Sequence, residues 1–506
     1  MKPTLSAINN KLGSIYPGPA RTWPRGLNLI LALIFLLSAC TAPETLTPMP
    51  VLPREPVFPT PAAIFTPLPT RAPYGPAELV DYTAQTGDTL PALAVRFNTS
   101  IAEIRTANPI IPQSATTMPP GMPMKIPIYY LPLWGTPYQI IPDSLFADGP
   151  AQLDFDIEGF INAQPGWLKN YRGQLSDNVY SGAQIIRLVA NNFSVSPRLQ
   201  LALLEYFGQA LSNPLMPDTT YVLGYHEQFH QGVYLQLVWM ANTLNNGYYG
   251  WRRGSLTEFE HPDTRIERPD PWQNAATVAL QYAFSRLYST PVFDQMIGPG
   301  GLAETYAHLF GDPWQNVKPH IPGSLTQPDF ILPFEPGHGW TYTGGPHTGW
   351  GKGEPYAAID FAPSGVSACG SSDDWTTAMA DGVIARSELA EVVLDLDGDG
   401  NEQTGWNIFY LHLSSFDRIA AGKNVKAGDR LGHPSCEGGE TTGTHVHIAR
   451  KYNGEWILAD SPIPFNMEGW VVRNGSDAYL GTLVRFSQTV TASDQSEGKS
   501  FIKSDR

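Results

Sequence analysis

The phrase Gly443-Thr444-His445-Val446-His447-Ile448 has the pattern of a β-strand and carries two histidines two positions apart. Residues i and i+2 of a strand point to the same side of a sheet, about 6–7 Å apart. We therefore expect His445 and His447 to share one cleft. His412, in the apolar phrase Phe409-Tyr-Leu-His412-Leu, lies in another predicted strand and can enter the same cleft from a neighbouring position.

Two more phrases supply possible metal ligands, Gly344-Gly-Pro-His347-Thr-Gly and Ala357-Ala-Ile-Asp360-Phe. Three protein ligands of the His and Asp type, with a fourth position left for water, form the usual arrangement of catalytic zinc. A neighbouring imidazole can transfer protons near neutral pH or hold a developing oxyanion. Histidines buried singly in a core would not explain these phrases together, so the pattern predicts a catalytic zinc site.

The segment from about Pro333 to Arg485 resembles the lysostaphin-type zinc metallopeptidases, specifically their beta-lytic branch. The shared features are a Trp-x-Tyr-x-Gly lead-in, a glycine-rich loop before the aspartate, and Cys436-Glu-Gly-Gly before the histidine pair. The resemblance implies an all-β peptidase domain over 328–487, with an open, barrel-like antiparallel sheet. It also implies that zinc is bound by three side chains, those of His347, Asp360 and His447. Two further histidines, His412 and His445, would then act on the metal-bound water and the oxyanion.

One position departs from the commoner lysostaphin-type pattern. There the first histidine lies four residues before the aspartate, where this chain has Tyr356. The beta-lytic branch places that histidine before a longer glycine-rich loop, where His347 stands. We expect His338 and His433 to be structural or exposed. The resemblance further implies a disulfide between two cysteines of this domain, Cys369 and Cys436.

The first 40 residues match a secretory signal, because basic residues precede the apolar run Leu27–Leu37. This run is too short to cross a bilayer. Leu37-Ser-Ala-Cys40 resembles the lipobox of bacterial lipoproteins, which implies that Cys40 is acylated and anchors the chain to the membrane, outside the cytoplasm. The following residues, 41–78, are rich in proline and predict an extended tether.

Residues 79–128 show a strand, two short amphipathic helices and a second strand. Gly87-Asp-Thr-Leu90, Ala94-x-x-Phe97, Asn108-Pro and Lys125-Ile-Pro occur in that order. The segment closely resembles a LysM domain, which implies binding of glycans that contain N-acetylglucosamine, such as peptidoglycan. The glycan contacts are expected in the loop after the first strand and in the loop between the second helix and the last strand.

Residues 129–327 have helical periodicity and predict an α-helical domain of unknown role. They contain His226-Glu227-Gln-Phe-His230, which on a helix would place two imidazoles on one face. No third ligand follows, since Gln236 stands where a metzincin histidine would, and we interpret the motif as a chance match. The surroundings of Glu205 faintly resemble the catalytic helix of lysozyme-like transglycosylases, but we interpret this residue as a carboxylate at a helix end.

The phrase Asp395-Leu-Asp397-Gly-Asp399-Gly resembles the start of a calcium loop. Position twelve is Trp406 rather than the bidentate glutamate of an EF-hand, so a polar hairpin turn explains the phrase equally well. Residues 488–506 are expected to form a disordered tail.

Length and composition agree with several domains outside the cytoplasm. The chain has 506 residues, 47 prolines, 47 glycines and only 16% charged residues, and this length corresponds to about three folded units. The formal net charge is −15, which argues against a nucleic-acid partner because that partner requires a basic face.

These features together predict a zinc-dependent metalloendopeptidase that binds peptidoglycan through the LysM domain and hydrolyses its peptide cross-links. Two alternatives stay open. One is a catalytically inactive wall-binding or activator lipoprotein that keeps the peptidase fold as a docking surface. The other is a glycan-cleaving enzyme that uses Glu205 of the helical domain.

Overall fold

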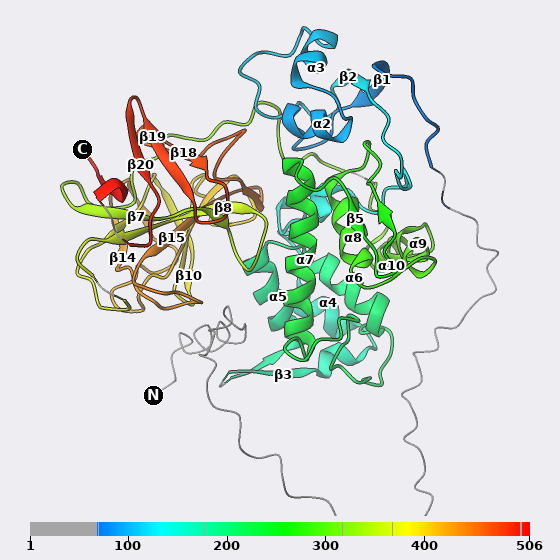
Figure 1. Ribbon diagram of the computed structural model, residues 1–506. Helices are drawn as coiled ribbons and strands as arrows, with labels where there is room; N and C mark the ends of the chain where they lie inside the picture. The colour runs from blue at the N-terminus through cyan, green and yellow to red at the C-terminus, as the bar shows by residue number, and fades with distance from the viewer. Residues whose placement is uncertain are drawn as a thin grey trace, which may run out of the picture. The chain divides into compact units, whose positions relative to one another are not determined.

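The computed structural model describes residues 68, 70–176, 178–315, 317–366, 368–495 and 498–505 (Figure 1). The expected signal segment, Cys40 and most of the tether lie outside the described residues, so the expectations for them stay predictions. In the part of the chain that the structure describes, no helix combines the length and the apolar character that a membrane crossing requires.

The first region has the strand–helix–helix–strand order expected of a LysM domain. Its two strands pair antiparallel, with Val80 opposite Ile126. Thr89 and Ser100 cap the two helices by accepting hydrogen bonds from backbone amides of the first turn. Apolar side chains on the inner faces of the helices form the core with the strands. The elements are β1 (Glu78–Thr83), α2 (Leu90–Arg96), α3 (Ile101–Ala107) and β2 (Pro123–Ile128).

The second region is mainly helical, as its periodicity predicts. Ser196 caps one helix through its side chain and Pro197 occupies the first helical position, where no amide donor is needed. The main helices are α4 (Ile157–Ala163), α5 (Gly182–Phe193), α6 (Pro197–Gly208), α7 (Val233–Arg253), α8 (Ala275–Ser285), α9 (Val292–Ile297) and α10 (Leu302–Phe310). Shorter elements are η2 (Asp143–Leu145), η3 (Pro150–Gln152), η4 (Trp167–Asn170), β3 (Arg172–Leu175), β4 (Asn178–Ser181), β5 (Phe259–Glu260) and β6 (Ile266–Glu267).

The third region is an antiparallel β-domain built on a nine-stranded sheet, with the order β13-β10-β11-β12-β15-β8-β7-β21 and with β16 paired to β15. The strands of this sheet are β7 (Gly339–Thr348), β8 (Tyr356–Pro363), β10 (Gly382–Glu388), β11 (Glu391–Asp395), β12 (Trp406–Leu411), β13 (Asn424–Val425), β15 (Val446–Tyr452), β16 (Glu455–Ile457) and β21 (Phe501–Lys503). Two smaller sheets contain β9 (Thr376–Thr377) with β14 (Arg430–Gly432), and β17 (Asn466–Met467), β18 (Trp470–Asn474), β19 (Gly481–Arg485) and β20 (Gln488–Thr491).

The large sheet is apolar on both faces, because each face packs against a different core. Ile359, Ile408 and Ile448 point into the core of the β-domain. Phe409 and Ala449 pair across neighbouring strands and belong to the core that the helices α5–α10 form. The helical region and this face of the sheet therefore share one hydrophobic core.

The expectation of a disordered tail is wrong for the described residues of 488–506. Strand β20 pairs with β19, and β21 pairs with β7, where Ile502 lies opposite Trp340. Val490 and Ile502 are buried. Each strand has one such apolar anchor among polar residues, and η5 (Gly498–Ser500) lies between them. A pattern of this kind is too weak to predict a strand without the partner that covers it.

Candidate active site

The register of the large sheet brings the predicted metal ligands together. His447 on β15 lies directly opposite Asp360 on β8. Irregular pairing between β7 and β8 places His347 beside them. One possible ligand atom from each of these three side chains lies within 4.8 Å of the other two. All three side chains are buried. Their sheet face is the one that packs against the helices, because residues two positions along the strands point to the same side and belong to the helical core.

The distances within this cluster are those of a metal site. His347 Nε2 lies 3.0 Å from His447 Nδ1, and Asp360 Oδ1 lies 3.3 Å from each of these nitrogens. Donor atoms of a tetrahedral zinc site lie roughly 3.3 Å apart, given metal–donor distances of about 2.0–2.1 Å.

Backbone carbonyls fix which ring nitrogen of each ligand carries a proton. His347 Nδ1 lies 2.8 Å from the carbonyl oxygen of Gly345, and His447 Nε2 lies 3.1 Å from that of Gly349. A carbonyl oxygen only accepts, so these two nitrogens donate, and in the neutral rings the two nitrogens that face each other carry the lone pairs. Asp360 Oδ1 is buried without a hydrogen-bond partner. Three electron-pair donors thus converge, which fits a bound cation.

His412 and His445 stand beside the cluster with their rings 4.5 Å apart. Their Nδ1 atoms donate to the carbonyl oxygens of Glu437 and Gly443, at 2.7 and 2.8 Å. In the neutral rings, this leaves the lone pair on Nε2, and Nε2 of His445 lies 3.8 Å from Asp360 Oδ1. His412 also adopts a left-handed backbone conformation, with φ +67°, which is uncommon outside glycine and is often found at functional sites.

The charge states of the cluster follow from burial and from the facing groups. Burial alone would raise the pKa of Asp360, but the positive charge that His347 and then His445 carry when protonated holds this pKa well below its usual range. Burial and the neighbouring imidazoles His445 and His447 lower the pKa of His412 well below its ordinary value. At neutral pH, the cluster therefore combines an ionised carboxylate with a neutral imidazole at His412.

The five residues line one cleft of about 1300 Å³. Cys369 and Cys436, which the sequence resemblance pairs, are bonded to each other and also line this cleft. Thr444, the residue before His445, donates from its amide to the carbonyl of Ala368 and from its hydroxyl to the carbonyl of Gly370. The disulfide and these bonds hold together the two loops beside the histidine pair.

Tyr479 is a site residue that no sequence motif indicates. Its ring stacks on His347, with ring centres 4.1 Å apart and planes at 19°. Its amide donates to the carbonyl of Pro346, and its carbonyl accepts from the amide of Gly345. Burial raises the pKa of Tyr479 to about 12. The residue lies in a loop of the four-stranded sheet, far from the histidine phrases in sequence, so only the fold brings it to the metal cluster.

The helical region holds the loop that anchors His447. Two side chains one turn apart on α7 accept from this loop: Asn242 Oδ1 from the amide of Lys352 at 2.9 Å, and Asn246 Oδ1 from the amide of Glu354 at 2.8 Å. Gly349, whose carbonyl fixes the proton of His447, begins the same loop.

The other candidates have local structural explanations. His226, Glu227 and His230 lie in the loop before α7 rather than on a helix, which agrees with the interpretation as a chance match. Glu205 accepts hydrogen bonds from the amides of Leu211 and Ser212 after α6. His338 is paired with Asp374 at the surface, and His433 packs on Trp375.

The acidic loop Asp395–Asp399 is the turn between β11 and β12. Asp395, Asp397 and Asp399 place one carboxylate oxygen each within 4.8 Å of the others. Their oxygens also accept hydrogen bonds from amides of the same loop, for example Gly400 N to Asp395 at 2.8 Å. Burial raises the pKa of Asp395 to about 6. The hairpin turn that the sequence allows is therefore present.

Two family models match the chain: the LasA N-terminal domain over residues 139–323 and the LysM domain over residues 82–127. Protease LasA of Pseudomonas aeruginosa is 23% identical over 333 residues, which cover 62% of this chain and 74% of that protein. Beta-lytic metalloendopeptidase of Lysobacter enzymogenes is 30% identical over 136 residues, which cover 25% of this chain and 70% of that enzyme. The solved structure of the M23 metalloprotease pseudoalterin is 27% identical, with a TM-score of 0.28, and covers 33% of this chain and 96% of that one.

Proposed function

The chain belongs to the beta-lytic family of M23 metalloendopeptidases, and we propose that it is a zinc enzyme that hydrolyses peptide cross-links of peptidoglycan. The observation that carries the proposal is the convergence of two unprotonated imidazole nitrogens and an unpartnered carboxylate oxygen, 3.0–3.3 Å apart, in a cleft of about 1300 Å³. Two further histidines face the same space, so the cleft contains both a metal site and proton-transfer groups.

His347, Asp360 and His447 are the proposed zinc ligands. Zinc bound there would supply Lewis acidity, which polarises a scissile carbonyl and makes water more acidic. The hydrogen bonds to Gly345 and Gly349 leave the lone pairs of the neutral rings on the proposed ligating nitrogens, and a hydrogen bond donated by the other ring nitrogen raises the basicity of a histidine ligand.

His412 and His445 are the proposed catalytic residues. His412 is neutral at physiological pH because its pKa is lowered, so its Nε2 can accept a proton from the attacking water and return it to the leaving amine. His445, beside it, is placed to hydrogen-bond the oxygen that gains charge in the transition state. Both rings are held by backbone carbonyls, so little reorientation is required during the reaction.

The LysM domain is the proposed peptidoglycan-binding module, through N-acetylglucosamine units and the two loops that follow β1 and α3. Acylation at Cys40 would keep the enzyme at the membrane, next to the wall. Lipid labelling of the full-length chain, with Cys40→Ala as the control, is the measurement that tests this anchor.

Digestion of purified peptidoglycan by the full chain tests the proposal, with mass spectrometry to identify the new ends. We expect new amino termini, and we expect a chelator to abolish them and added zinc to restore them. New reducing sugar ends that withstand the chelator would instead indicate a glycan-cleaving enzyme. Binding without any release by zinc-loaded protein would indicate an inactive wall-binding protein.

A further inference from the structure

The two loops of the LysM domain that are expected to contact glycan already hold another part of this chain. Residues 321–325, which lead from the helical region toward the β-domain, lie against Thr117. Thr117 accepts from the amide of Ser324 through its carbonyl at 2.8 Å and from the amide of Leu325 through its hydroxyl at 3.0 Å. The same hydroxyl donates to the carbonyl of Pro322 at 2.7 Å.

Two more threonines complete this contact: Thr86 in the loop after β1, and Thr116, which precedes Thr117 in the loop after α3. Thr86 Oγ1 accepts from the amide of Ile321 at 2.9 Å and lies 3.2 Å from its carbonyl oxygen. Thr116 Oγ1 donates to the carbonyl of Leu325 at 2.6 Å. Three threonine hydroxyls and one carbonyl of the LysM domain thus bind amides and carbonyls of one short segment, which turns at Gly323 and Ser324.

The fit between the segment and the second loop leaves no free space at Gly323. A Cβ atom added there would lie 2.7 Å from both Cα and Cγ of Pro119. Ile321 and Leu325, on either side, are buried in a small core with Trp406 and Ile457 of the β-domain. The segment is therefore enclosed between the LysM loops and the β-domain.

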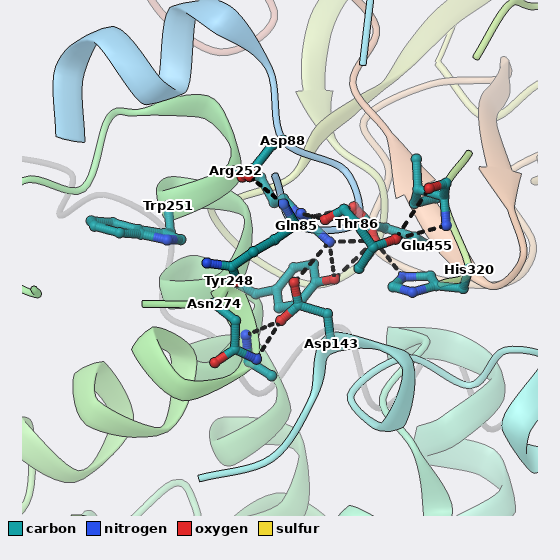
Figure 2. Close-up of polar contacts among 12 residues, drawn as sticks. Gln85, Thr86, Asp88, Asp143, Tyr248, Trp251, Arg252, Asn274, His320 and Glu455 are labelled. Atoms are coloured by element: carbon teal, nitrogen blue, oxygen red, sulfur yellow. Dashed lines mark hydrogen bonds and ion pairs between the residues drawn. The ribbon is translucent and has the colours of Figure 1, made fainter. Parts of the chain in front are cut away.

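Buried charges fix the start of the segment (Figure 2). Arg252 at the end of α7 donates to the carbonyl of Thr86 and pairs with Glu455 of β16 at 3.1 Å and Asp143 at 3.2 Å. His320, the residue before the segment, lies 2.7 Å from the same Glu455. Groups from all three regions meet around this one arginine.

We propose that residues 321–325 mask the glycan-binding loops of the LysM domain, so that wall glycan and this segment compete for one surface. This inference rests on the proposed binding of glycan by the LysM domain. An N-acetylated sugar offers hydroxyls and an acetamido group, which require the same donors and acceptors that the segment now uses. The full chain binds glycan only in the fraction of molecules whose segment has left the loops, and its apparent affinity is reduced by that fraction.

The substitution Gly323→Val unmasks the loops without changing any LysM residue, because its side chain would collide with Pro119. The matched control is Gly300→Val, since a Cβ at Gly300 meets its nearest neighbour at an ordinary 3.8 Å and lies away from the LysM domain. We expect Gly323→Val to bind a soluble hexamer of N-acetylglucosamine at least about tenfold more tightly than the wild type in calorimetry. The control should bind like the wild type.

Hydrogen exchange of the wild-type full chain provides a second test that needs no substitution. The amides of Ser324 and Leu325 donate to Thr117, so we expect saturating hexamer to speed their exchange. Gly323→Val should show fast exchange at these amides even without hexamer, with slow exchange retained in the core of the β-domain as evidence that the variant is folded.

Three results would overturn the masking. If the wild type and Gly323→Val bind hexamer with equal affinity, and the variant shows fast exchange, then the LysM domain binds glycan but residues 321–325 do not compete with it. Hexamer bound to the wild type without faster exchange at Ser324 and Leu325 would place the sugar elsewhere. If neither protein binds hexamer, again with fast exchange in the variant, glycan binding by the LysM domain and masking are both refuted. The proposed peptidase activity would still be tested separately, by the release of peptide ends from peptidoglycan.

Discussion

Two of the buried polar clusters in the described part of the chain differ in what faces each charged or polar atom. In the cluster of His347, Asp360 and His447, two unprotonated nitrogens and a carboxylate oxygen face one another. In the cluster around Arg252, the guanidinium faces Asp143 and Glu455. The first arrangement costs folding free energy until a cation binds, because its donor atoms face no positive charge. In the second arrangement, the positive charge of Arg252 is balanced by carboxylates of the protein itself. Burial of charge alone therefore does not identify a functional site, but donors that lack a counter-charge do.

The largest expected effect is on catalysis and separates the two clusters. His447→Ala removes a metal ligand, so we expect cross-link hydrolysis to fall by at least about 1,000-fold. The fold should persist, because His447 belongs to neither of the two large hydrophobic cores. Release of amino termini from peptidoglycan and circular dichroism measure the two effects. An active His447→Ala enzyme would contradict the assignment.

Arg252→Ala should have the opposite outcome, a loss of stability. The substitution leaves Asp143 and Glu455 buried without their cation, which costs about 3–5 kcal/mol of the free energy of unfolding. Urea unfolding measures the effect. Arg253→Ala is the matched control, because Arg253 is 36% exposed and pairs with Glu354 near the surface. The control should lose less than about 1 kcal/mol, and equal losses in both variants would contradict the role of the Arg252 cluster.

Zinc should stabilise the protein only through the histidine cluster. A ligand present at about 100 times its dissociation constant adds roughly 2.7 kcal/mol to the free energy of unfolding. We expect this gain in unfolding experiments with the wild type and its absence in His447→Ala. A gain that persists in His447→Ala would show that zinc binds elsewhere.

The smallest effect is the pH dependence of the Arg252 cluster. Burial alone would raise the pKa of Glu455, but Arg252 and His320 lower it to about 2. Because the folded-state pKa lies below the unfolded value of about 4.3, this carboxylate stabilises the fold above that pH and loses the contribution as the pH falls toward 2. The difference in unfolding free energy between the wild type and Glu455→Gln should therefore shrink over this range. A difference that stays constant with pH would contradict the ionised state of Glu455.

Local sequence patterns single out the residues of the histidine cluster as candidates, because each lies in a short phrase with strand or loop character, whereas the fold of the β-domain and the role of each residue were predicted from the family resemblance. His445 and His447 are two positions apart, and the register of β15 with β8 then brings Asp360 opposite. The contact of the Gly349 carbonyl with His447 and that of the Tyr479 ring with His347 could not be predicted, since each joins segments that are distant in sequence.

The connection between the regions was equally inaccessible from the sequence. The core that the helices share with Phe409 and Ala449 requires knowledge of which sheet face they cover. The apolar residues of β20 and β21 are too few to predict strands. Likewise, nothing near Thr86 or Thr117 in the sequence indicates that residues 321–325, about 200 positions later, bind to them.

Metal content is the measurement that tests the central assignment most directly. We expect one zinc ion per chain in the wild type and in the double variant His226→Ala, His230→Ala, which alters the turns before α7. The double variant His347→Ala, His447→Ala should bind no zinc while remaining folded. Zinc retained by His347→Ala, His447→Ala and lost from His226→Ala, His230→Ala would contradict the assignment of the metal site to the large sheet.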